Sequence, residues 1–352
     1  MPPDLALTAV LATMAGFVDY GQICSFVAEN KEWLKDIVRF PSGGKTQDQG
    51  AFRHAFEKAG TDIYEKMAEN IMPSINAAVN PLRDPGCGIR ILSADGQESA
   101  GSGRSGCVGG CRRAMGSENL FDSSAGILIK TSEISGKSSE SNALAEMLGS
   151  GEFKGCVSAA DAGAARSATM EACAEGGMHW ISAAKDNNKK AFRSIKGIFG
   201  FSGAAPLFEG GCACSAALKP AEALPDLPAF SGIIAKRTLD CSHGALIARD
   251  YFLALDVESL GLGKKFPGFA SAGCVRTAKI PNNPYKPPEA GYRYFFSSVE
   301  NLDIFAYAVR KHWCVEEYHF QVDTAMKNDE NRTTAGCGSF QPAEIKKVAL
   351  TL

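Results

Sequence analysis

Residues 88–96 read GIRILSADG, a short apolar run that ends on an aspartate and a glycine. The same pattern returns at residues 156–162, which read CVSAADA. Short apolar runs bounded by turn residues are typical of buried strands, so we expect Asp95 and Asp161 each to end a strand. A helical pattern follows the second run at residues 164–175. Strands that alternate with helices in this way predict an α/β core.

Helical and strand patterns also fill the rest of the chain. Residues 4–80 carry apolar residues at spacings of three and four, which indicates helices. The segment 99–117 is rich in Gly, Ser and Arg and is expected to be a loop. Residues 203–291 carry many Pro and Gly residues together with short strand-like pieces. Further strands are expected at residues 125–129, 179–184 and 292–299, and a further helix at residues 142–149.

The composition is typical of a globular protein. The chain has 352 residues, of which 45% are hydrophobic and 22% are charged. Lys and Arg number 37 against 39 Asp and Glu, which gives a formal net charge of −2. This balance excludes a protein that coats nucleic acid through bulk positive charge, so nucleic-acid contacts would need local basic patches. We find no apolar run of membrane-spanning length and no basic residue in residues 1–4, so we expect no membrane span, no signal peptide and an intracellular protein.

The 12 cysteines are spread along the chain. The close pairs, Cys107 with Cys111 and Cys212 with Cys214, lack the spacing of a zinc site, and the five histidines do not cluster near them. We therefore expect reduced thiols, many of them buried. A zinc-binding or redox protein is the alternative.

A third acid lies in the helical pattern of residues 302–326. The stripe that shares one face of this expected helix consists of Leu302, Phe305, Val309, Trp313, Glu316, Phe320 and Asp323. Glu316 and Asp323 interrupt an otherwise apolar face, and a buried carboxylate needs a cationic partner. That partner is either Arg or Lys, or a metal ion that Asp95 and Asp161 also bind. Three carboxylates suit Mg²⁺ or Mn²⁺, and two such ions support phosphoryl chemistry.

Several short motifs run along the chain in a fixed order. They are Trp33-Leu34, Phe40-Pro41, Ala94-Asp95-Gly96, Lys137-Ser138-Ser139-Glu140, Asp161-Ala162, Lys185 with Asn187-Asn188, His243-Gly244 with Arg249, Phe266-Pro267-Gly268, and Arg310 to Glu316 with His319 and Asp323. In content and order these motifs resemble those of the transposases of the H-repeat-associated insertion-sequence family. Those enzymes are DDE transposases with a ribonuclease-H-like core.

The resemblance implies a fold for each part of the chain. Residues 1–85 would form a small helical domain associated with these transposases. Residues 86–352 would form the catalytic domain, an α/β, ribonuclease-H-like core built on a mixed sheet. Residues 203–291 would then be a β-rich insertion in that core.

The resemblance also implies an activity. Asp95, Asp161 and Glu316 would be the catalytic triad and would bind two Mg²⁺ (or Mn²⁺) ions. The reaction would be hydrolysis at the ends of the element, followed by attack of the freed 3′-hydroxyl on target DNA. The partners would be the terminal inverted repeats and the target DNA, and a homodimer is left open. The expected location is the bacterial cytoplasm at the nucleoid, or the nucleus in a eukaryotic host.

Candidate DNA contacts follow from the basic run after residue 184 and from the motifs. They are Lys137, Lys185, Asn187, Asn188, Lys189, Lys190, Arg193, His243, Arg249, Arg310 and His312. The alternative for the basic run is a solvated helix face, and Trp313 is expected in the core. Gln97, Ala100 and Ala245 stand where the family carries Lys, Arg and Arg, so three positive charges are missing. The second hypothesis is therefore a catalytically impaired, transposase-derived DNA-binding protein.

Overall fold

The computed structural model describes most of the chain, in two compact units. The described residues are 3–40, 48–58, 66, 74, 88–99, 115–134, 139–149, 151–164, 166–200, 208–209, 219–220, 232–242, 245–283, 285–286, 289–330 and 340–352. The first unit is drawn from Met1–Pro85, Leu92–Met147 and His312–Leu352, and the second from Gly86–Ile91 and Leu148–Lys311. None of the described helices is long and apolar enough to cross a membrane.

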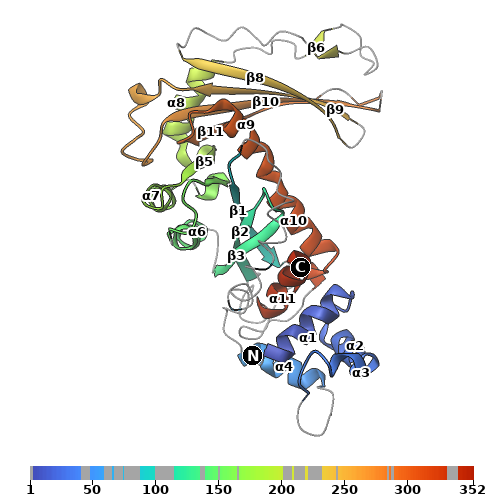
Figure 1. The fold of residues 1–352 in the computed structure, drawn as a ribbon. Helices are drawn as coiled ribbons and strands as arrows, with labels where there is room; N and C mark the ends of the chain where they lie inside the picture. Colours follow the sequence, from blue (N-terminus) through green and yellow to red (C-terminus); the bar gives the residue numbers. More distant parts are fainter. Residues whose placement is uncertain are drawn as a thin grey trace, which may run out of the picture. The chain divides into compact units, whose positions relative to one another are not determined.

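The first unit combines helices from both ends of the chain with a small antiparallel sheet (Figure 1). Its helices are α1 (Pro3–Met14), α2 (Tyr20–Glu29), α3 (Lys31–Leu34), α4 (Gln49–Lys58), α6 (Glu140–Leu148), α10 (Trp313–Thr324) and α11 (Phe340–Thr351). Its strands are β1 (Ile91–Ser99), β2 (Met115–Asp122) and β3 (Ile127–Ile134). Strand β2 lies in the middle and pairs with β1 on one side and β3 on the other.

Short-range hydrogen bonds explain two local features of this unit. Asp19 caps α2: its carboxylate accepts from the Gln22 N–H (2.8 Å), and the Gln22 side chain accepts from the Asp19 N–H (3.3 Å). Asp122 shapes the turn between β2 and β3, because its Oδ1 accepts from the N–H groups of Ser124 and Ala125 (3.0 and 3.1 Å). Both aspartates therefore supply side-chain acceptors to backbone N–H groups at the ends of these elements.

One apolar core joins the N-terminal helices to the C-terminal ones. Its members come from α1, α2 and α4, from β2 and β3, and from α10 and α11. They include Val10, Val27, Phe52, Phe56, Phe121, Leu128, Val315, Val322, Ile345 and Val348. The helices expected in residues 4–80 are confirmed within 3–34 and 49–58, while the predicted boundary at residue 85 lies outside the described residues and stays a prediction.

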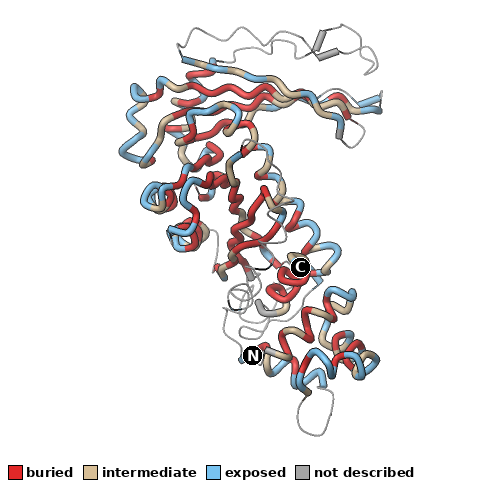
Figure 2. The backbone as a smooth tube through the Cα atoms, viewed as in Figure 1, coloured by how far each residue is buried: buried red, intermediate tan, exposed pale blue. Residues whose placement is uncertain are grey.

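The second unit is built on a mixed sheet with the strand order β4-β5-β11-β10-β9-β8. Its strands are β4 (Val157–Ala160), β5 (His179–Ala184), β8 (Ile233–Ser242), β9 (Ala245–Ala254), β10 (Ser271–Pro281) and β11 (Glu289–Ser297), with a separate short pair β6 (Phe208–Glu209) and β7 (Lys219–Pro220). Its helices are α7 (Ser167–Glu175), α8 (Lys189–Phe199) and α9 (Leu302–Lys311). Strands β4 and β5 are parallel, and the other neighbours in this sheet are antiparallel. Figure 2 shows β10 as mostly buried, whereas the outer strand β8 alternates between intermediate and exposed residues.

Most of the expected elements are confirmed. The strands expected at 125–129, 156–162, 179–184 and 292–299 correspond to β3, β4, β5 and β11, and the expected helices to α6 and α7. The stretch 203–291 contains β8, β9 and β10, which are ten or eleven residues long rather than short pieces. Through β11 these strands extend the same sheet that contains β5. The α/β class is therefore confirmed, and the ribonuclease-H-like assignment stays a prediction.

The single helix expected over residues 302–326 is wrong. The structure has two helices, α9 and α10, interrupted at His312. Helix α9 buries Phe305 and Val309 of the stripe, but in α10 Trp313 and Phe320 are exposed. The reason is that the two helices pack into different cores, and α10 buries its opposite face. The buried residues of α10 are Val315, Tyr318, His319 and Val322.

Gly273 of β10 lies directly against α9. A Cβ added at Gly273 would be 2.2 Å from Cζ of Phe305, whose ring is fully buried and has little room to move. We expect Gly273→Ala to lower the free energy of unfolding by about 1–3 kcal/mol, because overpacking a filled core strains it. Chemical denaturation measures this, with Gly291→Ala on the neighbouring β11 as the control, since a Cβ there meets nothing within 4 Å. Equal stability of the two variants would contradict the close packing of α9 on β10.

Candidate active site

Asp95 lies in the middle of β1, which corrects the expectation that it ends a strand. Strand β1 continues to Ser99, and Asp95 is paired in register with Asn119 of β2. The polar residues after Asp95 resemble a turn in sequence, but Gln97 is buried and donates to Oδ1 of Asp323 on α10 (2.8 Å). A distant hydrogen-bond partner thus allows a polar segment to continue as a strand.

The Asp95 carboxylate faces a histidine of α10. Its Oδ2 is 3.2 Å from Nδ1 of His319, which is buried. Glu316 lies three residues before His319 in the first turn of α10, so the two side chains are neighbours on the helix surface. The positive end of the helix dipole also favours a carboxylate at that position. Asp95 and Glu316 thus both belong to the first unit and both neighbour His319.

Two further glutamates crowd the same strand. A Cβ at Gly96 would be 3.0 Å from Oε1 of Glu140 and 3.5 Å from Oε2 of Glu118. Burial raises the pKa of Glu118 to about 9, and the negative charges of Glu140 and Asp95 add to this rise. Glu118 is therefore a neutral carboxylic acid near pH 7.

Replacing this buried acid is expected to change how stability depends on pH. The folded state binds the Glu118 proton up to about pH 9, whereas an unfolded glutamate loses it near the ordinary value of 4.5. The stability that Glu118 contributes is thus complete below pH 4.5 and is lost as the pH rises toward 9. We expect the Tm of Glu118→Gln to rise above that of the parent by an amount that grows with pH over this interval, as measured by thermal unfolding. The exposed change Glu146→Gln on α6 is the control, and a pH-independent Tm difference for Glu118→Gln would contradict the assignment.

Asp161 directly follows β4 in the second unit, as expected. A short 3₁₀ turn (Ala162–Ala164) begins at the next residue. Two cations neighbour its carboxylate: Nζ of Lys185 is 3.4 Å from Oδ2, and Nη2 of Arg293 is 3.8 Å from Oδ1. Asp161 is therefore paired with two protein cations, whereas the cationic partner predicted from the sequence was for Glu316 and Asp323.

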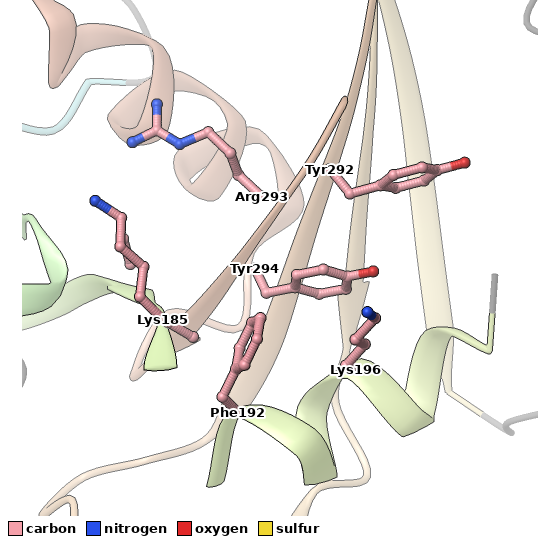
Figure 3. Close-up of a pocket in the computed structure, with 8 residues that line it drawn as sticks. Lys185, Phe192, Lys196, Tyr292, Arg293 and Tyr294 are labelled. Atoms are coloured by element: carbon pink, nitrogen blue, oxygen red, sulfur yellow. The ribbon is translucent and has the colours of Figure 1, made fainter. Parts of the chain in front are cut away.

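A pocket of about 430 Å³ lies beside these cations, where β5 ends and β11 continues past it. Figure 3 shows the rings of Tyr292 and Tyr294 on one side of β11 and the side chain of Arg293 on the other. The Phe192 ring packs edge-on against Tyr294, with ring centroids 5.7 Å apart. The residues that line the pocket are Ala183, Ala184, Lys185, Phe192, Lys196, Tyr292, Arg293 and Tyr294. Cations beside aromatic rings are the groups that contact phosphates and stack on bases.

The candidate DNA contacts near this pocket fall on α8 and on the turn before it. Lys189, Lys190 and Arg193 are exposed on α8, and Lys185 lines the pocket. The two asparagines of this turn make internal contacts. Asn187 donates to the carbonyl of Ala162, and the Oδ1 of Asn188 accepts from Lys265 (2.6 Å).

The other candidate contacts are spread over both units or lie outside the described residues. Arg249 and Arg310 face the same carboxylate, that of Asp240, at 3.4 and 4.0 Å. His312 is buried at the break between the two helices. Lys137 and His243 lie outside the described residues. Sequence reasoning missed Tyr292 and Arg293, because a basic residue within a strand pattern gives no signal of a pocket.

The described residues do not form a preformed metal site. Carboxylates are suitable donors for Mg²⁺ or Mn²⁺. Across the described ranges, however, no three His, Cys, Asp or Glu side chains are grouped closely enough to hold a metal ion. In the structure the Asp95 carboxylate faces His319, and that of Asp161 pairs with Lys185 and Arg293. These arrangements do not fit a bound ion as they stand.

The described cysteines are free thiols, and several are buried. They are Cys24, Cys156, Cys173, Cys241, Cys274 and Cys314. Burial raises the pKa of Cys173 to about 12, so this thiol is unreactive. The close pairs that motivated the zinc alternative lie outside the described residues.

Comparison with known proteins adds one full-length relative. No family model matches the chain. The chain is 23% identical over 354 residues to the protein named "Putative transposase YncI" of Escherichia coli O157:H7, and the match covers 99% of this chain and 81% of that protein. This chain is similar to a transposase over almost its whole length.

Among solved structures, the chain matches one in the cryo-EM structure of the piggyBac transposase synaptic complex with hairpin DNA. The TM-score is 0.40, with 11% sequence identity over 99% of this chain. The match covers 65% of that chain, so this protein spans less than two thirds of its length.

Proposed function

We propose that this protein is a DNA transposase of the H-repeat-associated insertion-sequence family. The similarity to YncI over 99% of the chain carries the proposal, because a match of that length spans both units rather than one shared element. The ordered motifs around Asp95, Asp161 and Glu316 support the same family. The reaction would cut DNA strands and join the freed 3′-hydroxyl to target DNA.

The proposal assigns cleavage to the three acids Asp95, Asp161 and Glu316. Asp95 and Glu316 neighbour His319 in the first unit, and Asp161 follows a buried strand in the second. Mg²⁺ or Mn²⁺ would supply the activation of the attacking water or hydroxyl, which carboxylates alone do poorly. The residue types of the acids suit oxygen ligation, but their arrangement in the structure does not itself hold an ion, so binding would require Asp161 to give up its pairing with Lys185 and Arg293.

DNA is the proposed partner of the second unit. Lys185, Lys196 and Arg293 around the pocket supply positive charge for phosphates, and Tyr292 supplies a half-buried ring for a base. The exposed lysines at the start of α8 continue this basic surface. Because the net charge of the chain is −2, DNA binding would depend on a local basic patch, and these residues supply one.

A second candidate function is DNA binding without cleavage. Two observations favour it: Asp161 is engaged with two cations, and the described residues hold no metal-binding group of three. A transposase-derived protein that has lost catalysis would keep the basic pocket and bind DNA. The two functions therefore differ in cleavage and agree in binding.

The test is nicking of supercoiled plasmid DNA in Mn²⁺, together with a DNA-binding measurement on the same samples. We expect the parent to nick the plasmid and to stop when the metal is chelated. Asp95→Asn and Glu316→Gln should each lose nicking, whereas Glu175→Gln, an exposed acid at the end of α7, should keep it. Equal nicking by all variants would contradict the role of the acids. Binding without nicking by a folded parent would favour the second function.

A further inference from the structure

A chain of buried hydrogen bonds runs from the last helix to Asp95. It begins at Lys347 of α11, whose side chain is fully buried. From there it passes through Asn119 of β2 and His319 of α10 and reaches Asp95 of β1. All four residues belong to the first unit.

The Lys347 ammonium is surrounded by oxygen atoms. Its Nζ is 2.9 Å from Oδ1 of Asn119 and 3.0 Å from Oε1 of Glu344. The hydroxyl oxygens of Ser117 and Thr131 lie at 2.8 and 3.0 Å. Glu344 is buried beside it, so the pair places one cation and one anion together in the core.

This cation fixes the orientation of the Asn119 amide. An ammonium group has only donors, so the atom of Asn119 that faces Lys347 must be the oxygen. The Asn119 amide nitrogen then faces the other way, toward Nε2 of His319 at 2.9 Å. The same nitrogen is 3.5 Å from the Ser117 hydroxyl, which agrees with a donor at that position.

The amide in turn fixes the protonation of the His319 ring. The Asn119 nitrogen donates, so Nε2 of His319 must accept and carries no proton. The ring proton is therefore on Nδ1, the atom 3.2 Å from Oδ2 of Asp95. A neutral histidine thus donates one hydrogen bond to the carboxylate and leaves its negative charge in place.

We propose that Lys347 is a positioning residue for Asp95, acting through Asn119 and His319 by selecting the Nδ1–H tautomer of the histidine. The catalytic part of this inference rests on the proposed function, because it takes Asp95 as a catalytic acid. The tautomer itself follows from the contacts alone. Changing an outer partner of a catalytic ligand typically costs 10–100-fold in activity, and we expect a loss of that size here.

The decisive variant is Asn119→Asp. Aspartate has the same shape as asparagine but presents an oxygen acceptor to Nε2 of His319, so the ring must carry a proton there. The variant keeps an oxygen facing Lys347, so that contact is retained. The control Asn301→Asp lies in the other unit, where the side chain of Asn301 accepts from the first N–H groups of α9.

The readout is long-range ¹⁵N–¹H NMR of the full-length protein labelled on histidine, which distinguishes the two ring nitrogens. The His319 signals are identified by their loss in His319→Gln. We expect Nδ1–H in the parent and in Asn301→Asp, and a protonated Nε2 in Asn119→Asp. An Nε2–H tautomer in the parent, or unchanged His319 signals in Asn119→Asp, would overturn the inference.

Plasmid nicking separates this inference from the proposed function. We expect Asn119→Asp to nick about 10–100-fold more slowly than the parent with unchanged DNA affinity. Unchanged nicking in Asn119→Asp would overturn the positioning role. A parent that shows the Nδ1–H tautomer but nicks no DNA would refute the proposed function and would leave the tautomer assignment standing.

Discussion

Replacing Lys347 by methionine is expected to lower the free energy of unfolding of the first unit by about 3–5 kcal/mol. The change removes the ammonium group that pairs with Glu344, whose carboxylate is fully buried. It also removes the ammonium group that donates hydrogen bonds to the side chains of Ser117, Asn119 and Thr131. An uncompensated charge and unsatisfied polar groups in a core are among the costliest defects a single substitution makes.

Chemical denaturation measures this cost, and two further variants identify its source. Lys347→Met with Glu344→Leu should recover much of the loss, because the pair is then replaced by apolar groups. Lys35→Met removes a surface pair with Glu32 (2.5 Å) and should change the free energy of unfolding far less, since both side chains are exposed. Comparable losses from Lys35→Met and Lys347→Met would contradict the buried network.

The second large effect is expected at Asp250 in the second unit. Its carboxylate is fully buried on β9 and is shared by two guanidinium groups. Nε of Arg237 is 2.5 Å from Oδ1, and Nε of Arg276 is 2.8 Å from Oδ2. Asp250→Asn keeps the shape of the side chain but removes the anion between two neighbouring cations. We therefore expect the free energy of unfolding to fall by about 3–5 kcal/mol.

Asp240→Asn is the matched control for this change. Asp240 lies on the adjacent strand β8 and also faces two arginines, Arg249 and Arg310, but it is partly exposed and its contacts are 3.4 and 4.0 Å long. We expect the free energy of unfolding of this variant to fall by less than about 1 kcal/mol, because water screens such partly exposed pairs. If the two variants unfold at the same denaturant concentration, burial is not the source of the stability at Asp250.

The sequence predicts those parts of the fold where hydrophobic pattern and burial agree. Strand β5 was expected with the bounds it has, and Asp161 was expected to follow β4 as it does. Both strands are short apolar runs that are buried throughout or nearly so. In such segments the local pattern and the tertiary packing favour the same structure.

Prediction failed where a distant partner changes what a residue does. Gln97 and Ser99 continue β1 because Asp323 and Asn328 bind their side chains, and no local pattern signals such partners. Trp313 was expected in the core and is exposed, because α10 turns its opposite face inward. Helix α11 was missed for a related reason, since its buried stretch includes Glu344, Lys346 and Lys347, which resemble surface residues in sequence.

Some residues of the candidate site could likewise be identified from the sequence, and others only from the structure. Its three acids were identified from motifs, and their catalytic roles stay predictions. His319 was noted as part of a motif, but its contact with Asp95 depends on how α10 packs against β1. Arg293, Tyr292 and the Lys347 network depend on strand register and on long-range contacts, which composition and periodicity do not encode.

The most direct test of the central claim is strand cleavage by Asp161→Asn compared with Asp186→Asn. Both changes remove one carboxylate from the second unit, and Asp186 is an exposed residue of the next turn. Supercoiled plasmid is incubated with each full-length protein in Mn²⁺, and a DNA polymerase then extends any nick that carries a 3′-hydroxyl. If the protein is a transposase whose cleavage depends on Asp161, the parent and Asp186→Asn will produce extendable nicks and Asp161→Asn will produce none. Extendable nicks at equal rates from all three proteins would contradict the account.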